Sequence, residues 1–423
     1  MIRVSLPYGR GAQELDVPAD RSEVLESDLQ TMAPSAPGCE IVARAMAAPV
    51  GSPPLEELAA GKKTAVVIIS DHTRPVPSRE ILPAMLAALR RGSPGIKITL
   101  LVATGCHRET RLEELREKLG DEIFSRERIL IHNCDDLEHM TLLGQLPSGM
   151  PLYINQAAAE ADLLVAEGFI EPHFFAGYSG GRKSVLPGIC ARRTVMGNHC
   201  AALIDDPGAR TGVLEANPIH QDMAAAARMA GLRYIVNVIL NQHKQIVDAV
   251  AGDALLAHEA GCSRLSARCR AIPREKGDVV VTTNGGAPLD QNVYQAVKSL
   301  STAEMAAKPG AVLIVCAQCA DGIGGDMFFQ SLRDCTSPSR LLEQLRAIPA
   351  EETVPDQWQY QILARILEGH RVIFVTEPEL EHAVHAMKME YMPSARQALS
   401  LVLEQAPTGH ILVIPDGVST VVG

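Results

Sequence analysis

Runs of β-branched and aliphatic residues recur along this chain, and they limit its fold more than any other feature. The clearest runs of strand length are residues 64–70, 96–103, 162–168, 278–283 and 311–316. Such continuous runs are typical of parallel strands that are covered on both faces. Segments with a helical pattern, such as 78–91, separate them. The sequence therefore predicts an α/β fold with mainly parallel sheets flanked by helices.

The length of the chain predicts two domains. A chain of 423 residues is longer than one hydrophobic core usually supports. A polar connector near residues 271–277 gives an N-terminal cofactor and catalytic domain over 1–272 and a C-terminal α/β domain over 273–423. The last strand, near 410–417, is a candidate to return to the first domain. Ligands in open α/β sheets bind outside the carboxyl ends of the strands, so we expect the active site in the cleft between the domains.

Charge and composition argue against several classes of function. The formal net charge is −11 and aromatic residues make up 4% of the chain, so a nucleic-acid surface is not expected. The N-terminus lacks the apolar region of a signal peptide, and no apolar run is long enough to cross a bilayer. With scattered cysteines and no export signal, we expect a cytoplasmic protein with reduced thiols. The sequence assigns no role to Cys106, Cys200 or the pair Cys316 and Cys319; a zinc or redox role for the pair is a minor alternative.

Polar residues gather where two of the predicted strands end. Asp71, Thr73 and Arg74 follow the run 64–70, and Gly105 and His107 follow the run 96–103. The carboxyl ends of parallel strands are where function is expected in such folds. A capped loop with a surface ion pair is the alternative for the first group, and a structural histidine is the alternative for the second.

The segment 171–199 follows a third buried run and concentrates the most polar chemistry. His173 opens the segment and His199 ends it. A glycine-rich turn lies between them and contains Ser179, Gly180, Gly181, Arg182 and Lys183. A structural segment rarely combines so many polar side chains with so flexible a backbone. We therefore interpret 171–199 as an active-site segment.

A predicted helix in the second domain carries a further polar group. Gln291, Gln295 and Lys298 are spaced by four and three residues, so they share one helix face, and Tyr294 lies beside it. A solvated face is the alternative interpretation.

Together these residues suit chemistry on both faces of one small anion. Two histidines on different loops, His107 and His173, can serve as proton acceptors on either side, as the interconversion of stereoisomers requires. Arg74 and Lys298 can hold a carboxylate. The turn 179–183 suits a phosphate-bearing cofactor, and its lysine can attach one covalently if the amine is deprotonated.

The motifs, taken in order, resemble those of the nickel-pincer lactate racemase family. The residues that carry the resemblance are Ser70-Asp71-x-Thr73-Arg74-Pro75, Ala103-Thr104-Gly105-x-His107-Arg108, Pro172-His173, Ser179-Gly180-Gly181-x-Lys183, Pro187-Gly188 and His199. They span residues 70–199, and the length and two-domain layout extend the resemblance to nearly the whole chain.

This resemblance implies a racemase or epimerase of 2-hydroxy acids that works by proton-coupled hydride transfer to a nickel-pincer nucleotide. By the same resemblance His107 and His173 are the paired acid and base, His199 is the nickel ligand and Lys183 is the covalent tether of the cofactor. The implied cofactor contacts are Asp71, Thr73, Gly105, Ser179, Gly180, Gly181 and Arg182. The implied substrate contacts are Arg74, Tyr294, Gln295, Lys298 and Trp358.

The resemblance leaves the substrate open. Lactate and larger 2-hydroxy acids both fit it, and a 2-epimerase of a sugar acid is the alternative within the family. A pyridine-nucleotide-dependent 2-hydroxy acid dehydrogenase and a non-catalytic phosphate-binding module are the alternatives from other classes. The expected partners are a small 2-hydroxy acid and the enzymes that make the cofactor, with no nucleic acid and no membrane.

Overall fold

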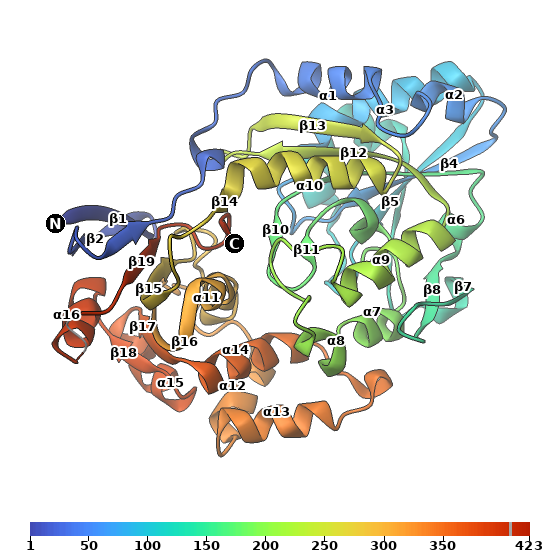
Figure 1. Ribbon diagram of the computed structural model, residues 1–423. Coiled ribbons are helices and arrows are strands. Elements are labelled where there is room, and N and C mark those ends of the chain that lie inside the picture. The colour runs from blue at the N-terminus through green and yellow to red at the C-terminus, as the bar shows by residue number, and fades with distance from the viewer. Residues whose placement is uncertain (406–407) are drawn as a thin grey trace.

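Two six-stranded sheets organise the protein in a computed structural model that describes residues 1–405 and 408–423 (Figure 1). In spatial order the first sheet contains β13 (Ile246–Gly252), β12 (Leu232–Leu240), β9 (Leu163–Phe169), β4 (Thr64–Ser70), β5 (Lys97–Ala103) and β6 (Arg128–Ile131). The second contains β18 (Glu390–Met392), β17 (Arg371–Val375), β16 (Ala307–Cys316), β15 (Gly277–Thr283), β19 (Ile411–Ile414) and β3 (Ser22–Val24). Neighbouring strands are parallel, except that β13 is antiparallel to β12. The predicted α/β fold is confirmed.

Helices cover both faces of the first sheet, which explains why its strands are continuous apolar runs. Every residue of β9 is buried. The helices on one face are α1 (Gly38–Ala47), α2 (Leu55–Ala59), α3 (Ser78–Gly92) and α4 (Leu112–Leu119). Those on the other face include α7 (Arg192–Asn198), α8 (Ala201–Asp205), α9 (Pro218–Met229) and α10 (Leu256–Cys269). The short helix α5 (Asp121–Arg126) also packs against the first face, while α6 (Gln156–Ala159) and the hairpin of β7 (Met140–Gln145) and β8 (Pro151–Asn155) add to the cluster on the second.

The second sheet is covered in the same way. One face packs against α11 (Val293–Ala306), α12 (Asp326–Asp334), α13 (Pro338–Arg346) and α14 (Gln357–Gly369). The other packs against α16 (Ala395–Gln405) and the hairpin of β1 (Ile2–Tyr8) and β2 (Gly11–Val17). The short helix α15 (Glu381–Ala386) lies beside β18.

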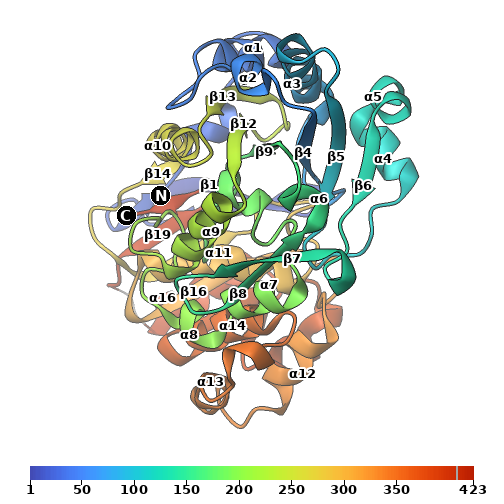
Figure 2. The same cartoon turned by 90° about the vertical axis from the view of Figure 1, so that its right-hand side faces the viewer.

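The two halves are packed together through α8, α13 and α14, which lie against one another in Figures 1 and 2. The side chain of Gln361 on α14 donates to the main-chain oxygen of Ala201 and to Asp205 Oδ1, each at 2.9 Å. Arg346 on α13 forms an ion pair with the same aspartate, Nε–Oδ2 2.6 Å. One buried apolar cluster runs through both halves. The interface is therefore part of the core.

The paths of the chain termini differ from the prediction. The last strand, predicted near 410–417 with a possible return to the first domain, is β19, and it pairs with β15 and β3 inside the second sheet. The prediction of a return by that strand is wrong. Residues Val421–Val422 do return, since this strand, β20, pairs with β14 (Arg270–Ala271) at the end of α10. In addition β1, β2 and β3, predicted within the first domain, pack on or pair with the second sheet.

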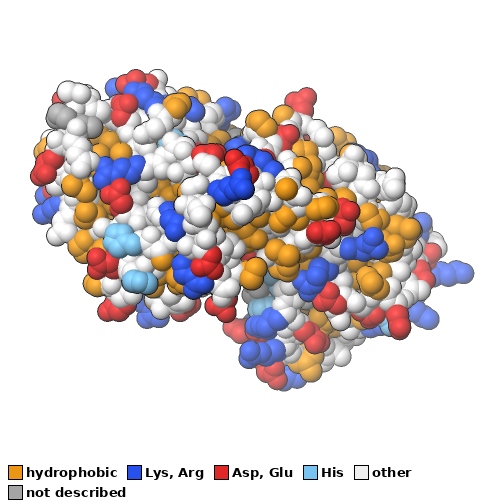
Figure 3. Space-filling view, turned by 90° about the horizontal axis from the view of Figure 1, so that it is seen from below, with side chains coloured by type: hydrophobic (Ala, Val, Ile, Leu, Met, Phe, Trp, Pro, Cys, Tyr) orange, Lys and Arg blue, Asp and Glu red, His pale blue; other side chains and the backbone are white. Residues whose placement is uncertain are grey.

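The surface gives two further facts about partners. Figure 3 shows charges of both signs mixed with apolar side chains over one face of the molecule, without a continuous basic patch on that face. Within residues 1–405 and 408–423 there is no helix both long enough and apolar enough to span a membrane.

Candidate active site

The loops that follow β4 and β5 are joined by a pair of titratable side chains. Asp71 is buried, and its Oδ2 accepts a hydrogen bond from His107 Nδ1 at 2.7 Å. Its Oδ1 accepts from both the main-chain nitrogen and the hydroxyl of Thr73, at 3.1 and 2.7 Å. Burial alone raises the pKa of Asp71, but the hydrogen bond and charge of His107 outweigh burial and lower it. Asp71 is therefore a carboxylate that holds the proton of His107 on Nδ1 and leaves Nε2 as the basic atom.

His173 lies on a two-residue strand, β10 (Pro172–His173), that forms a tight hairpin with β11 (Gly177–Tyr178). Within the hairpin the main-chain oxygen of Ala176 accepts the amide of Tyr178 at 3.0 Å, and a buried side chain supplies further donors. Arg182 donates to the main-chain oxygens of Ala176 and Tyr178, at 2.8 and 2.7 Å, and its Nε donates to His220 Nδ1. The Ala176 amide in turn donates to His173 Nδ1 at 3.3 Å.

Arg182 thus has a different place from the one that its motif suggests. Its side chain is fully buried and no carboxylate pairs with it in the described residues. Burial lowers its pKa to about 10, so the guanidinium still carries its charge at neutral pH. Arg182 shapes the hairpin that carries His173, and its contact with a cofactor stays a prediction.

The glycines of the turn are required by close contacts. Gly180 has φ +78°, and a Cβ there would lie 2.7 Å from both Asn237 Oδ1 and the main-chain oxygen of Phe169. Gly181 has φ +52°, and a Cβ there would lie 2.7 Å from the ring of His258. The amide of Gly181 donates to Asn237 Oδ1 at 2.7 Å. Only glycine therefore fits at position 180 and at position 181. These close contacts fix the path of the backbone that leads to Lys183.

Three basic side chains act on His173. Lys183 Nζ lies 3.3 Å from His173 Nε2. Burial lowers the pKa of His173 well below its usual value, and Lys183, Lys298 and Arg74 lower it further through their charges. Burial also lowers the pKa of Lys298 to about 8. None of the three basic side chains forms an ion pair among the described residues, although Glu171 acts on both lysines through its charge.

His199 ends α7 and is buried among aromatic rings. Its Nδ1 lies 3.0 Å from the main-chain oxygen of Val195, so Nδ1 carries the proton and Nε2 keeps a lone pair. Burial and the charge of Lys183 lower its pKa to about 3. The rings of Phe175 and Trp358 meet it edge to face, with centroids 5.1 and 4.9 Å away. His199 is therefore a neutral imidazole with one donor atom available.

The second domain contributes α11 and α14 to this region. Lys298 acts on His173 as described, and Trp358 contacts His199. Tyr294 Oη donates to Asp356 Oδ1 at 2.7 Å. Gln295 follows on the same helix, and its side chain has no hydrogen bond to any described residue. Gln291, predicted to share this helix face, precedes the start of α11 at Val293 and is exposed.

Gly105 and Ser179 connect these loops to one another. Gly105 has φ +54°, and its amide donates to the main-chain oxygen of Gly188 at 3.0 Å, which ties the second loop to the segment 171–199. Ser179 Oγ donates to the main-chain oxygen of Phe169 at 3.0 Å and accepts from the amide of Glu171 at 2.9 Å. Gly105 acts through its amide, and Ser179 acts through its hydroxyl on two main-chain atoms.

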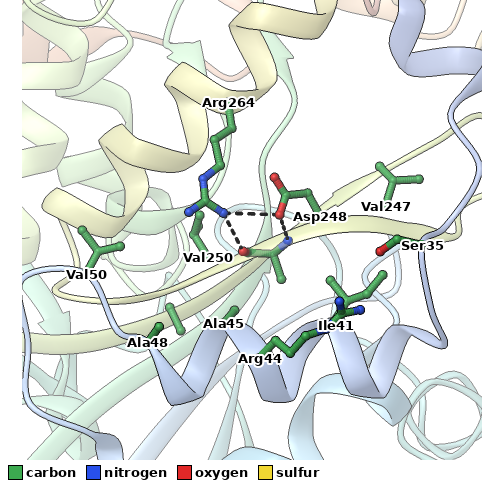
Figure 4. A pocket seen from close by; sticks show the side chains of 12 residues that line it. Ser35, Ile41, Arg44, Ala45, Ala48, Val50, Val247, Asp248, Val250 and Arg264 are labelled. Carbon is green, nitrogen blue, oxygen red and sulfur yellow. Dashed lines mark hydrogen bonds and ion pairs between the residues drawn. The ribbon is translucent and has the colours of Figure 1, made fainter.

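A cavity of about 370 Å³ lies between the two halves, beside the strand that leads to His173. Its lining includes residues 169–172 at the end of β9, 240–242 at the end of β12, residues 285 and 287–289 after β15, and residues 415, 416, 418 and 419 after β19. The carboxyl ends of both sheets therefore open toward one cleft. A second cavity, about 250 Å³, lies between α1 and β13, where Arg264 donates to Asp248 and Ala249 (Figure 4). None of the predicted site residues lines either cavity, although the first cavity is lined by Glu171 and Pro172, directly before His173.

The chain matches two known domain families. Residues 8–212 match the lactate racemase N-terminal domain, and residues 272–422 match the lactate racemase C-terminal domain. The chain belongs to the lactate racemase family. It is therefore an isomerase, as the order of its motifs predicts.

Individual members of the lactate racemase family are similar over their whole length. The lactate racemase of Thermoanaerobacterium thermosaccharolyticum is 44% identical over 100% of this chain and 99% of its own. That of Lactiplantibacillus plantarum is 43% identical over 100% of both. The structure of the Thermoanaerobacterium apoprotein superposes with a TM-score of 0.95 and covers 100% of each chain. A Thermotoga maritima protein, 18% identical, has a TM-score of 0.61 over 88% of this chain and shares the fold.

Several residues that organise this racemase site carry no clear signal in the sequence. Asn237 is the exception, because a polar amide in the middle of an apolar strand stands out in the sequence. Its buried side chain accepts the hydrogen bond of the Gly181 amide. His220 and His258, which contact Arg182, lie in ordinary helical patterns. Asp356 precedes a helix as many aspartates do.

The described residues contain no cluster of three or more His, Cys, Asp or Glu that could hold a metal ion.

Proposed function

We propose that this racemase interconverts the enantiomers of lactate, or of a larger 2-hydroxy acid, with a nickel-pincer nucleotide as its cofactor. The observation that carries the proposal is the group of basic side chains at His173: Lys183 Nζ lies 3.3 Å from His173 Nε2, and Lys298 and Arg74 act on the histidine through their charges. An anionic substrate and a phosphate-bearing cofactor would both supply the negative charge that this group lacks. The names of the two curated relatives favour lactate.

The residues fit the cofactor chemically. Burial, followed by the charge of Arg182, lowers the pKa of Lys183 well below its usual value. A neutral lysine amine is the form that attaches covalently to a cofactor. Nε2 of His199 has a lone pair, and imidazole is a suitable ligand for nickel. When bound, the nickel-pincer nucleotide supplies an acceptor for the hydride of the substrate's C2 atom.

The other residues handle protons and charge. His107, oriented by Asp71, takes the hydroxyl proton of one enantiomer at Nε2, and His173 exchanges the proton on the opposite face. Arg74 and Lys298 bind the carboxylate. That carboxylate opposes the charges that lower the pKa of His173, so substrate binding raises this pKa toward the range where proton exchange is efficient. The rings of Phe175 and Trp358 exclude water near His199.

The test is mass and nickel analysis of the protein produced together with the cofactor-making enzymes, which we propose as its partners in the cytoplasm. We expect one nickel per chain and an added mass on Lys183 in the wild type. The Lys183→Arg variant should lack the added mass, and His199→Ala should lose nickel. As a matched control, Lys63→Arg changes an exposed lysine that lines neither cavity and should behave as wild type. A wild-type protein with neither nickel nor nucleotide under these conditions contradicts the proposal.

A further inference from the structure

Asp356 breaks two local preferences at once. It precedes α14 with φ 65° and ψ 1°, a left-handed conformation that costs a residue with a Cβ about 1 kcal/mol. An aspartate at the start of a helix usually accepts hydrogen bonds from the first free amides, but Asp356 makes no such bond. Departures of this kind concentrate where a side chain serves another purpose.

The carboxylate of Asp356 is directed at Tyr294. It accepts the tyrosine hydroxyl at 2.7 Å. Gln359, one turn into α14, donates from Nε2 to the main-chain oxygen of Tyr294. Burial raises the pKa of Tyr294, and the charge of Asp356 raises it further, so the hydroxyl keeps its proton and donates it. The first turns of α11 and α14 are thus joined by two hydrogen bonds.

Trp358 lies between these contacts along the helix. Its ring meets the ring of His199 with centroids 4.9 Å apart and planes at 65°. Trp358 also lies close enough to Tyr294 to act against the rise in the pKa of the tyrosine. The indole therefore lies beside Tyr294, and its ring contacts the histidine that ends α7. Trp358 is the only tryptophan of the chain.

We propose that Asp356 is a positioning residue for the substrate side of the site: by holding the Tyr294 hydroxyl where α14 begins, it fixes the indole of Trp358 against His199. The inference rests on the proposed function, because Tyr294 and Trp358 face a substrate only there. The left-handed backbone directs the carboxylate away from the helix amides and toward α11. Asp356 thus positions Tyr294 and Trp358, the two side chains that would meet the 2-hydroxy acid. Asp356 does not touch the substrate itself.

Two substitutions separate the backbone from the side chain. Asp356→Gly accepts the left-handed conformation without strain and removes the carboxylate. Asp356→Asn tolerates the same conformation and keeps an oxygen that can accept from Tyr294. Glu352→Ala, at a nearby exposed position, is the control for the loss of one negative charge. Fluorescence of the apoprotein reports on Trp358 alone, and kinetics of the loaded enzyme report on the substrate.

We expect red-shifted emission for Asp356→Gly, because a released indole meets water. We also expect its KM to rise about tenfold with little change in kcat, as the loss of a hydrogen bond that acts on binding predicts. Asp356→Asn and Glu352→Ala should keep wild-type emission and KM. Wild-type values for Asp356→Gly would overturn the inference, and so would an Asp356→Asn variant as impaired as the glycine variant. If the loaded wild type racemises no 2-hydroxy acid, the proposed function fails, while the emission shift still decides whether Asp356 positions Trp358.

Discussion

Replacing Asp71 with asparagine should disable His107 without disturbing the fold. Oδ1 of Asp71 accepts two hydrogen bonds from Thr73, and Oδ2 accepts one from His107 Nδ1. The single carbonyl oxygen of an asparagine would remain with the two Thr73 donors. Its NH₂ group would then face Nδ1, which must become an acceptor. The ring proton moves to Nε2, and the atom that should take the substrate's proton already carries one.

The size of the effect follows from that loss. General base catalysis contributes roughly 10²–10⁴-fold to a rate. The His107 side chain is 46% exposed, so water weakens its hydrogen bond with Asp71 and we take the lower end. We expect kcat of the Asp71→Asn variant to fall about 100-fold, with little change in KM because Arg74 and Lys298 still bind the carboxylate.

The assay is racemisation by the loaded enzyme, started from each enantiomer in turn. Enantiomers have equal free energies, so kcat/KM must fall by the same factor in both directions. Nitrogen NMR of the His107 ring in the apoprotein reads the tautomer directly. The control is Asp136→Asn, which breaks an exposed pair of the same geometry, Oδ2 to His139 Nδ1 at 2.8 Å. A near-wild-type kcat for Asp71→Asn, or an unchanged tautomer, would refute the reasoning.

Three other substitutions test the supporting structure. Arg182→Met leaves the buried main-chain oxygen of Tyr178 without its side-chain donor, so urea unfolding should show a loss of about 1–3 kcal/mol. His132 is buried with its pKa lowered to about 4, so its contribution to stability is complete above the unfolded pKa of about 6.5 and is lost as the pH falls toward 4. In the wild type the unfolding free energy should therefore decrease as the pH falls between those values. In His132→Asn this decrease should be smaller by about 1.4 kcal/mol per pH unit. Lys118 Nζ donates to the main-chain oxygens of Arg74 and Val76, so Lys118→Met should raise KM about fivefold, as expected for the loss of a hydrogen bond of about 1 kcal/mol, while Glu117→Gln on the same helix should not.

The sheets and the ordered motifs could be predicted because local patterns determine them. The runs 64–70 and 162–168 become β4 and β9, and the polar residues that follow them reach the carboxyl edge of one sheet, as parallel topology requires. The order of the motifs was enough to predict the family. Helix bounds were less exact, since α11 begins at Val293 and excludes Gln291.

The contacts that the sequence could not show are those between distant segments. The pairing of β3 with β19 joins residues separated by most of the chain, and nothing in either segment indicates the partner. Arg182 is part of a ligand-binding motif in the sequence, but the hairpin geometry directs it to carbonyl groups. Asp356 has the sequence of an ordinary helix cap, and only its backbone conformation shows that the carboxylate turns to Tyr294.

The most direct test of the central claim is chiral chromatography of a single enantiomer of lactate incubated with the cofactor-loaded protein. We predict a mixture that approaches equal amounts of both enantiomers, without added NAD or NADP and without net oxidation. The His107→Ala and His173→Ala variants should each abolish the reaction in both directions. Loaded wild-type protein that leaves lactate and larger 2-hydroxy acids unchanged, or that converts them only when a pyridine nucleotide is consumed, would contradict the account.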